Sequence, residues 1–413
     1  VAGADQLIET IIRENSIAYN VEQLKAIRCA LHDKLMVLTG GPGTGKTTTI
    51  IGIIRALKML HLEIILAAPT GRAAKRLSEV TGEPAKTLHR LLEYNAEGGF
   101  LRNGENRLEG SVFIVDESSM IDVVLLHSLL LALPDKASLI MIGDVDQLPA
   151  VGPGNVLKDI IGSKAINTIF LTEIFRQAKE SKIVVNAHRI NSKQMPLVDN
   201  LETDDFFLIR EPKEEKILAL IEDLCRNRLP AKYGLNPLDD IQILVPMKKG
   251  AVGTKNINVM MQKSFNPTGR SVSYGDACYR VDDKVMQIKN NYEKKVFNGD
   301  IGRIVDINED DELMVDYEGE LVSYEQGELD EIQLAYCITI HKSQGSEYDC
   351  VILPLVSAHY IMLEKNLIYT AITRAKKLLI VIATEQILRI AIGRERVDKR
   401  NTRLMQKLRG RFQ

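Results

Sequence analysis

The segment Leu38–Ile50, LTGGPGTGKTTTI, constrains the fold more than any other part of this 413-residue chain. From Gly40 onward it has the P-loop spacing G-x-x-x-x-G-K-T, in which backbone N–H groups surround a polyphosphate, the lysine reaches the terminal phosphates and the hydroxyl holds Mg²⁺. The motif needs a buried strand before it and a helix after it, and KLMVLTG and KTTTIIGIIRALKML have these patterns. The sequence therefore predicts a nucleoside triphosphate site formed by Gly41, Pro42, Gly43, Thr44, Gly45, Lys46, Thr47 and Thr48.

The composition indicates a globular protein of about two to three domains, with 45% hydrophobic and 26% charged residues. No apolar run reaches the roughly 18 residues that a membrane helix needs, and the N-terminus does not read as a signal peptide. The five cysteines form no C-x-x-C pair, which argues against a zinc site and fits a reducing cytoplasm. Because the chain begins with Val, we expect a fragment whose native N-terminus is missing.

Strand-like runs alternate with helical patterns from about residue 35 to residue 170, as in LMVLTG, IILAAPT, VFIVDE and LIMIGD. This alternation is typical of a parallel α/β sheet that binds ligands at the carboxyl ends of its strands. A second α/β unit begins near Thr172 and has the strand-like runs IQILVPM, CVILPLV and KLLIVIAT. We therefore predict an α/β fold with two domains, residues 1–171 and 172–413.

Two segments interrupt this alternation. Residues 94–110 are polar and glycine-rich, and RNGEN within them is a turn signal, so we expect a β-hairpin inserted in the first domain. Residues 297–333, approximately, alternate apolar and polar positions, which predicts a small SH3-like β-barrel inserted in the second domain. This barrel is rich in acids, so we expect it to contact nucleic acid only through Lys294, Lys295 or Arg303. The basic stretch from Arg389 to the C-terminus is either a DNA patch or a solvated face.

Carboxylates follow the apolar run VFIV directly. A P-loop site needs one carboxylate that holds Mg²⁺ and a second that activates the attacking water, and we assign these roles to Asp116 and Glu117. Asp144 and Gln147 follow another apolar run, in IGDVDQLPAV. A glutamine there could sense the γ-phosphate or position water, but it could equally belong to a polar turn before Pro149.

Six segments occur in one order: GGPGTGKTT, VDESSMID, GDVDQLPAVGPG, LTEIFRQ, ITIHKSQGSEYDCVILPL and LIYTAITRAKK. Together they resemble the motifs of superfamily 1 helicases, in the RecD-like branch (superfamily 1B), from about Asn20 to about Leu408. The resemblance implies two RecA-like domains with ATP and Mg²⁺ in the cleft between them. It further implies a monomeric, ATP-dependent 5′–3′ translocase or helicase that acts in DNA repair or recombination on single-stranded DNA and single/double-strand junctions, not on membranes.

The resemblance also implies roles for residues around the nucleotide. Gln23 in NVEQLKAI matches a glutamine that reads the adenine edge. Arg176 and Arg374 match two arginines that reach the γ-phosphate, where a guanidinium stabilises the charge of the transition state. Gly345 and Glu347 match a motif that links the nucleotide state to the grip on DNA.

For DNA, the resemblance implies contacts from short hydroxyl side chains and cations, which suit phosphate oxygens. Read alone, each lysine would be a solvated surface residue and each histidine a hydrogen-bonded polar residue. The implied contacts are Thr70, Arg72, Thr87 and His89 in the first domain, and Lys248, Lys249, Thr254, Asn258, Thr339, His341 and Lys342 in the second.

The chain departs from the family pattern in three respects. Tryptophan is absent and aromatic residues total 5%, so the grip should rest more on the DNA backbone than on stacked bases. The 94–110 hairpin, which would act as the strand-separating pin, is short. Only about 20 residues precede NVEQLKAI, so the N-terminal region of larger RecD-like proteins is expected to be missing or reduced.

Three other functions share some of these motifs. The motor of a conjugative relaxase would be accompanied by clustered histidines and a catalytic tyrosine, which are not visible here. A nucleotide-dependent switch that does not translocate would be favoured by degenerate motifs, but those of this chain are intact. A P-loop kinase would not need two arginine motifs in a second α/β unit.

Overall fold

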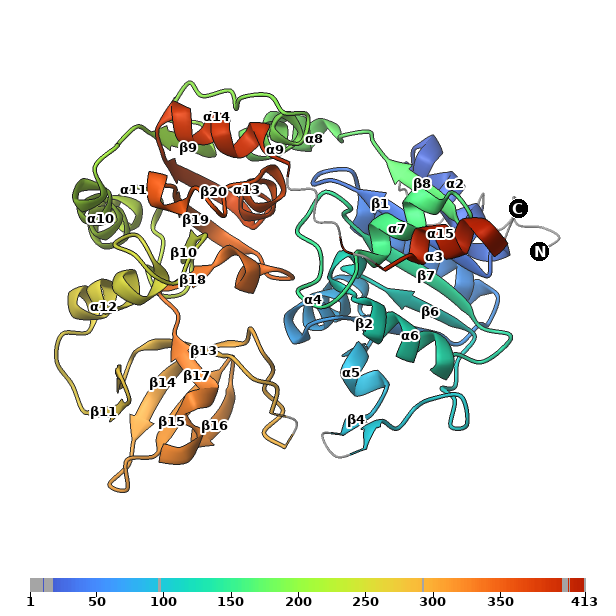
Figure 1. Ribbon diagram of the computed structural model, residues 1–413, viewed down its shortest axis with the longest axis horizontal. Helices are drawn as coiled ribbons and strands as arrows, with labels where there is room; N and C mark the ends of the chain where they lie inside the picture. Colours follow the sequence, from blue (N-terminus) through green and yellow to red (C-terminus); the bar gives the residue numbers. More distant parts are fainter. Residues whose placement is uncertain are drawn as a thin grey trace. The chain divides into compact units, whose positions relative to one another are not determined.

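The computed structural model describes residues 10, 18–95, 98–291, 293–395, 400 and 402–411. The chain forms two compact units: the first contains Val1–Glu180 and Val397–Gln413, and the second contains Ser181–Arg396 (Figure 1). This division differs from the expected domains 1–171 and 172–413. Residues after 171 stay with the first unit because Thr172 N–H donates to Glu22 at 2.7 Å and Phe175 N–H donates to the Gly43 carbonyl at 3.1 Å.

A six-stranded parallel sheet forms the centre of the first unit, in the order β3-β2-β6-β7-β1-β8. Alternate residues of its strands pack into two separate cores, because successive side chains of a strand point to opposite faces of the sheet. Met36 and Leu38 lie in one core, and Val37 lies in the other. The strands are β1 (Leu35–Gly40), β2 (Ile64–Ala68), β3 (Ala85–Thr87), β6 (Val112–Val115), β7 (Ser138–Gly143) and β8 (Asn167–Leu171).

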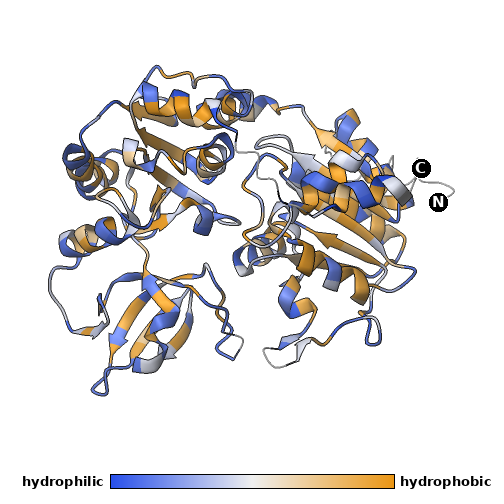
Figure 2. Ribbon diagram, viewed as in Figure 1, coloured by the Kyte–Doolittle hydropathy of each residue, from blue (hydrophilic) through white to orange (hydrophobic). Residues whose placement is uncertain are grey.

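The strands of this sheet are almost wholly apolar, and so is α6, whereas α4 is amphipathic (Figure 2). The red C-terminal helix α15 lies against α7 of this unit in Figure 1. The helices are α2 (Val21–His32), α3 (Lys46–Met59), α4 (Gly71–Thr81), α5 (Leu88–Leu91), α6 (Val123–Ala132), α7 (Val156–Ser163), α8 (Arg176–Glu180) and α15 (Leu404–Arg411), with the 3₁₀ turn η1 (Ser118–Met120).

The expected hairpin is present, but its turn is not where RNGEN predicts it. Strands β4 (Tyr94–Asn95) and β5 (Gly99–Phe100) pair antiparallel, and both precede RNGEN in the chain; residues 96 and 97 lie outside the described ones. The RNGEN segment folds around the Asn103 side chain, which accepts from the backbone N–H groups of Glu105 and Asn106 at 2.9 and 3.1 Å. Such a local turn needs no paired strands on either side.

A five-stranded parallel sheet forms the centre of the second unit, in the order β18-β10-β19-β20-β9. Its strands are β9 (Phe206–Ile209), β10 (Ile241–Val245), β18 (Cys337–Thr339), β19 (Tyr348–Pro354) and β20 (Ala375–Ile382). The helices are α9 (Lys182–Asn191), α10 (Glu214–Asp223), α11 (Leu229–Tyr233), α12 (Thr254–Phe265), α13 (Lys365–Ile372) and α14 (Glu385–Gly393), with the short turns η2 (Leu224–Arg228), η4 (Ile340–Ser343) and η5 (Ser357–His359).

The expected antiparallel insertion follows α12, and it begins earlier than residue 297. Its sheet has the order β16-β15-β14-β13-β17 and its own apolar core, which includes Val285 and Leu313. The strands are β13 (Lys284–Gln287), β14 (Ile301–Ile307), β15 (Leu313–Tyr317), β16 (Glu320–Tyr324) and β17 (Ile332–Leu334); the hairpin β11 (Ser271–Tyr274) and β12 (Ala277–Arg280) precedes them, and the turn η3 (Gln326–Glu331) precedes β17. In the described part of the chain, no helix is long and apolar enough to span a bilayer.

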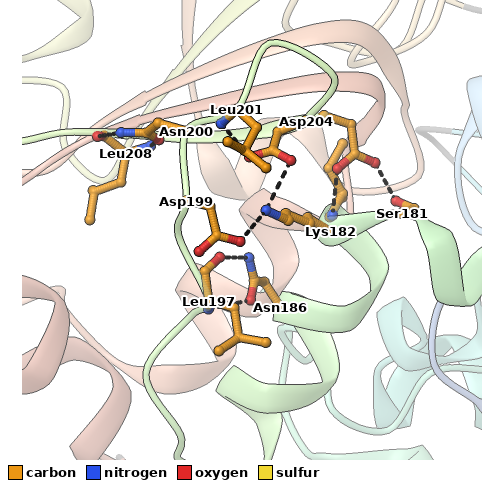
Figure 3. A network of polar contacts seen from close by, with 11 residues as sticks. Ser181, Lys182, Asn186, Leu197, Asp199, Asn200, Leu201, Asp204 and Leu208 are labelled. Atoms are coloured by element: carbon orange, nitrogen blue, oxygen red, sulfur yellow. Dashed lines mark hydrogen bonds and ion pairs between the residues drawn. The ribbon is translucent and has the colours of Figure 1, made fainter.

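A polar network fixes the point where the second unit begins (Figure 3). Asp205 accepts from the Ser181 hydroxyl and, at 3.1 Å, from the Ile183 N–H, which secures the first turn of α9. Lys182 lies between two carboxylates, at 2.6 Å from Asp199 and 2.9 Å from Asp204. This network explains why the division falls at Ser181 and not at Thr172.

We expect Asp205→Ala to lower the free energy of unfolding of the second unit by about 1–2 kcal/mol, because it removes two bonds from a helix N-terminus. Asp199→Ala is the matched control: its carboxylate side chain is 60% exposed, and such pairs contribute about 1 kcal/mol or less. Urea unfolding, monitored by circular dichroism, measures the free energy of unfolding of both variants. Equal losses in the two variants would contradict this account of the boundary.

Candidate functional site

The P-loop follows β1 and ends at Gly45, which caps α3 with a left-handed φ of 81°. A Cβ atom at this position would lie 2.5 Å from a ring carbon of Phe175 and 2.6 Å from Nε2 of Gln23. Both the conformation and the space therefore require glycine. The first backbone N–H groups of α3 have no acceptor within the helix, so this turn presents donors suited to an anion.

Lys46 and the threonines lie where the motif predicts them, at the start of α3. The Lys46 ammonium donates to the carbonyls of Gly40 and, at 3.2 Å, Gly41, so it lies against the beginning of the loop. Thr44 Oγ1 donates to the Gly41 carbonyl at 2.8 Å, which closes the loop on itself. The Thr47 side chain is exposed and available to a ligand.

Gln23 is buried against the P-loop, but its amide already has protein partners. Its Oε1 accepts from Asn20 N–H at 3.0 Å, in a capping box, and its Nε2 donates to the Gly45 carbonyl at 3.3 Å. The structure thus shows Gln23 supporting the loop, and reading of an adenine edge would require it to exchange these bonds. The spacing Asn-x-x-Gln at the start of a helix is the sequence signal for this box.

Phe175 is a site residue that the sequence interpretation missed. Its N–H donates to the Gly43 carbonyl, and its ring contacts Gly45. Since Arg176 is the next residue and its side chain is exposed, the LTEIFRQ segment places this arginine directly after a contact with the P-loop. The sequence signal for this contact is an aromatic residue directly before the arginine of LTEIFRQ.

Asp116 and Glu117 follow β6 at the same carboxyl edge of the sheet as the P-loop. Glu117 has a left-handed φ of 50°, and its N–H donates to Asp116 Oδ1 at 2.8 Å. Burial, and then the charge of Glu117, raise the pKa of Asp116 to about 6, while Lys46 and Arg76 act in the opposite direction. A divalent cation would relieve this crowding of negative charge, so the residues present fit Mg²⁺.

Gln147 has an unsatisfied acceptor. Its Nε2 donates to Asp144 Oδ2 at 3.4 Å, which orients the amide, and Asp144 is itself held by the Asp146 N–H at 3.0 Å. Gln147 Oε1 is buried and has no hydrogen-bond partner among the described residues. Buried acceptors are rarely left without a donor. This geometry favours the positioning of a water molecule over an ordinary polar turn.

In the second unit, Arg374 supports the turn that contains Gly345 and Glu347. It is 2% exposed and donates to the carbonyls of Ser346 and Thr370 and to the Thr373 hydroxyl, at 3.0 to 3.3 Å. Gly345 has a left-handed φ of 74°. The two segments that the sequence interpretation linked to the nucleotide are therefore joined by this buried guanidinium.

The expected DNA contacts of the first unit lie at helix N-termini and beside the hairpin. Thr70 and Thr87 cap α4 and α5, where their hydroxyls accept from backbone N–H groups at 3.3 and 3.1 Å, and Arg72 lies in the first turn of α4. The His89 ring lies 5.6 Å from Tyr94 and 5.7 Å from Phe100, measured between ring centroids. Burial lowers the pKa of His89, which favours the uncharged form of its ring.

In the second unit, Lys342 and Lys248 form a cationic pair. Lys342 Nζ donates to Gln333 Oε1 at 3.3 Å, and burial, and then the charge of Lys248, lower the pKa of Lys342 to about 8. Burial also lowers the pKa of the adjacent His341. Among the other expected contacts here, Thr339 and Thr254 are buried, whereas Lys249 is exposed.

Two residues expected to contact DNA are bonded within the fold. The Asn258 amide donates to the carbonyls of Leu334 and Cys337 at 3.0 and 2.9 Å and accepts from Cys337 N–H at 2.8 Å, which binds α12 to β18. Lys294 pairs with Glu328 and lies 4.8 Å above the Tyr324 ring, inside the inserted domain. A DNA contact from either residue would require it to exchange these bonds.

Family comparisons agree with this arrangement. The AAA domain family matches residues 23–153, the ATP-dependent RecD-like DNA helicase SH3 domain matches residues 257–317, and the UvrD-like helicase C-terminal domain matches residues 334–382. The RecBCD enzyme subunit RecD of Mycolicibacterium smegmatis is 31% identical over 427 residues, which cover 94% of this chain and 75% of that protein. The chain belongs to the RecD helicase family.

The ATP-dependent RecD2 DNA helicase of Deinococcus radiodurans is 36% identical over 388 residues, and the match covers 94% of this chain but 52% of that protein. The chain thus spans about half the length of this relative. The Pif1 helicase from Bacteroides, in complex with ADP-AlF3 and single-stranded DNA, has a TM-score of 0.55 at 20% identity and covers 88% of this chain and 92% of that one. The expected fold, two RecA-like domains and an SH3-like insertion, is confirmed, with the insertion beginning earlier than expected.

We expect Gly45→Ala to abolish nucleotide binding, because its Cβ would displace Phe175 or Gln23 from the P-loop. Gly82→Ala, at the end of α4, is the matched control: it has a similar φ of 71° and open space around it, so it costs about 1 kcal/mol of strain and no affinity. Titration with a fluorescent ATP analogue measures both variants. Retained binding in Gly45→Ala would show that the packing around Gly45 is not what shapes the loop.

Proposed function

We propose that this RecD-family chain is a motor that hydrolyses ATP to move 5′ to 3′ along single-stranded DNA and to unwind duplexes, in DNA repair or recombination. The observation that carries the proposal is the set of Lys46, Asp116, Glu117 and Gln147 at the carboxyl edge of one parallel sheet, with a buried acceptor on Gln147 that lacks a donor. A set of this kind suits hydrolysis of a phosphoanhydride, and the family supplies the link to DNA.

Each residue of the set has a defined task in this proposal. Bound ATP with Mg²⁺ supplies the phosphoryl group and the cation that neutralises it. Lys46 would exchange its loop carbonyls for phosphate oxygens, and Thr47 and Asp116 would hold the cation. Glu117 takes a proton from the attacking water, which Gln147 Oε1 orients.

Arg176 and Arg374 complete the proposed site. Guanidinium groups stabilise the charge that spreads over the transferred phosphoryl group. Because Arg374 is bonded to Ser346, beside Gly345, a change in its partners would move that turn, which adjoins Lys342. This supports a link between the nucleotide state and the grip on DNA.

The proposed DNA contacts combine backbone and base recognition. Lys342 and Lys248 offer charge to phosphates, as do the exposed Lys249 and the helix N-termini capped by Thr70 and Thr87. The ring cluster of His89, Tyr94 and Phe100 offers an aromatic surface on the hairpin, with Tyr94 39% exposed. Although the chain has few aromatic residues, this cluster can stack on a base at a single/double-strand junction and act as the pin.

We further propose that the motor acts as a monomer in the cytoplasm. Its five cysteines are free thiols, as a reducing compartment maintains them, and the proposed substrate is DNA.

Unwinding of two duplexes, one with a 5′ and one with a 3′ single-stranded tail, tests the proposal. We expect ATP-driven unwinding from the 5′ tail alone, and none with Lys46→Ala, which removes the phosphate-binding cation. ATP turnover is read in the same samples with and without DNA. Turnover that DNA does not stimulate would support the nucleotide-dependent switch and contradict a motor.

Affinity for single-stranded DNA should fall as the pH rises from 7 to 9, because Lys342 loses its charge around its pKa of about 8. In Lys342→Met this pH dependence should be absent, and the slope of log affinity against log salt should decrease by about 1. Lys249→Met is the control, since it removes an exposed lysine and should change the salt slope but not the pH dependence. Fluorescence anisotropy of labelled oligonucleotides measures the affinity of the wild type and of both variants. An unchanged pH dependence in Lys342→Met would exclude Lys342 from the DNA contact.

A further inference from the structure

Arg400 makes an unusual contact with a loop of the first unit. Its Nη1 lies 2.6 Å from the carbonyl oxygen of Ala150, 2.9 Å from that of Gly152 and 2.8 Å from that of Gly154. These carbonyls belong to the segment AVGPG, which follows Gln147. Hydrogen bonds from a charged donor are about twice as strong as neutral ones. The guanidinium therefore holds the carbonyls of three alternate loop residues around one nitrogen.

The two glycines of the loop have no room for a side chain. A Cβ at Gly152 would lie 1.9 Å from Asp122 Oδ2. Gly154 has a φ of 91°, and a Cβ there would lie 2.4 Å from Val123 Cγ2 and 3.0 Å from Thr402 Cγ2. The Val123 N–H also donates to the Pro153 carbonyl at 2.9 Å. The loop is thus enclosed between the start of α6 and the C-terminal segment.

This enclosed loop adjoins both residues that act on water in the proposed mechanism. The Ala150 N–H donates to the Ser119 carbonyl at 3.1 Å, and Ser119 lies in the turn η1 that Glu117 begins. Gln147 precedes the loop by a few residues in the chain. A displacement of the loop would therefore move the Gln147 amide and the Glu117 carboxylate relative to each other.

The segment that contains Arg400 is anchored separately. Thr402 Oγ1 donates to Asp159 at 2.7 Å, and Arg409 donates to the Gly162 carbonyl at 2.6 Å. Leu404 and Leu408 pack against the core that includes α7. These contacts hold the backbone on the C-terminal side of Arg400. The basic stretch, which the sequence leaves open as a DNA patch or a solvated face, therefore has a structural role at Arg400.

We propose that Arg400 is a positioning residue for ATP hydrolysis: it holds the Ala150–Gly154 loop so that Gln147 and Glu117 face the attacking water together. The proposal rests on the proposed ATPase function. Arg400 follows the end of α14, the last helix of the second unit, by only a few residues. The C-terminal segment therefore provides a direct covalent route from that unit to the loop.

The test compares Arg400→Ala, Arg400→Lys and the control Arg409→Ala, which removes a contact of the same segment with α7 but none with the loop. For DNA-stimulated ATP turnover, we expect Arg400→Ala to lower kcat roughly tenfold with KM for ATP unchanged, since the P-loop is untouched. Arg400→Lys should recover part of kcat, because it keeps the charge but not the fork geometry. Arg409→Ala should lower Tm and leave kcat unchanged.

Amide hydrogen exchange in the nucleotide-free protein gives a readout independent of activity. In Arg400→Ala, the amides of Ala150 and Val123 should exchange faster, while those of β1 and β7 should not change. Unchanged exchange at these two amides would overturn the proposal, as would an equal loss of kcat in Arg409→Ala. If wild-type protein showed no ATP turnover, the proposed function would fail, and the exchange data would still decide whether Arg400 holds the loop. Should Arg400→Ala not fold, Arg400→Gln replaces it in every measurement.

Discussion

The close fit around Gly45 is the constraint on which the rest of the site depends. A residue with no side chain lets Gln23 and Phe175 approach the P-loop from two elements that are distant in sequence, α2 and the segment before α8. The same approach fixes the first turn of α3, whose free N–H groups create the anion site. The same contact keeps residues after β8 in the first unit, because the Phe175 N–H binds the P-loop shortly before the chain reaches Ser181.

The charged residues of the site in the first unit suit a ligand that carries both positive and negative charge. Asp116 and Glu117 crowd negative charge, which raises the pKa of Asp116, whereas Lys46 lies against loop carbonyls. A polyphosphate with bound magnesium would neutralise both kinds of charge. Its cation would bind the carboxylates, and its phosphates would bind the ammonium. The unsatisfied Gln147 acceptor adds a place for the water that attacks.

Features set by local pattern could be predicted from the sequence, and features set by distant contacts could not. The P-loop strand and helix, the carboxylates after β6 and the second α/β unit follow from periodicity and motif spacing. The hairpin turn was misplaced because the Asn103 side chain satisfies the RNGEN turn without paired strands. The bonds of Asn258 to Cys337 and of Lys294 to Glu328 join distant segments, so no local pattern indicates them. Arg400 contacts residues about 250 positions earlier, which no local pattern contains.

The most direct test of this account is ATP turnover by Gln147→Ala in the presence of single-stranded DNA, with nucleotide affinity measured in the same preparation. We expect nucleotide affinity to stay within about twofold of wild type, because the P-loop is intact. Turnover should fall by roughly 100-fold, the scale of a lost water-orienting or proton-transfer group. Turnover equal to that of wild type would show that the Gln147 acceptor does not serve the attacking water, and the central claim would fail.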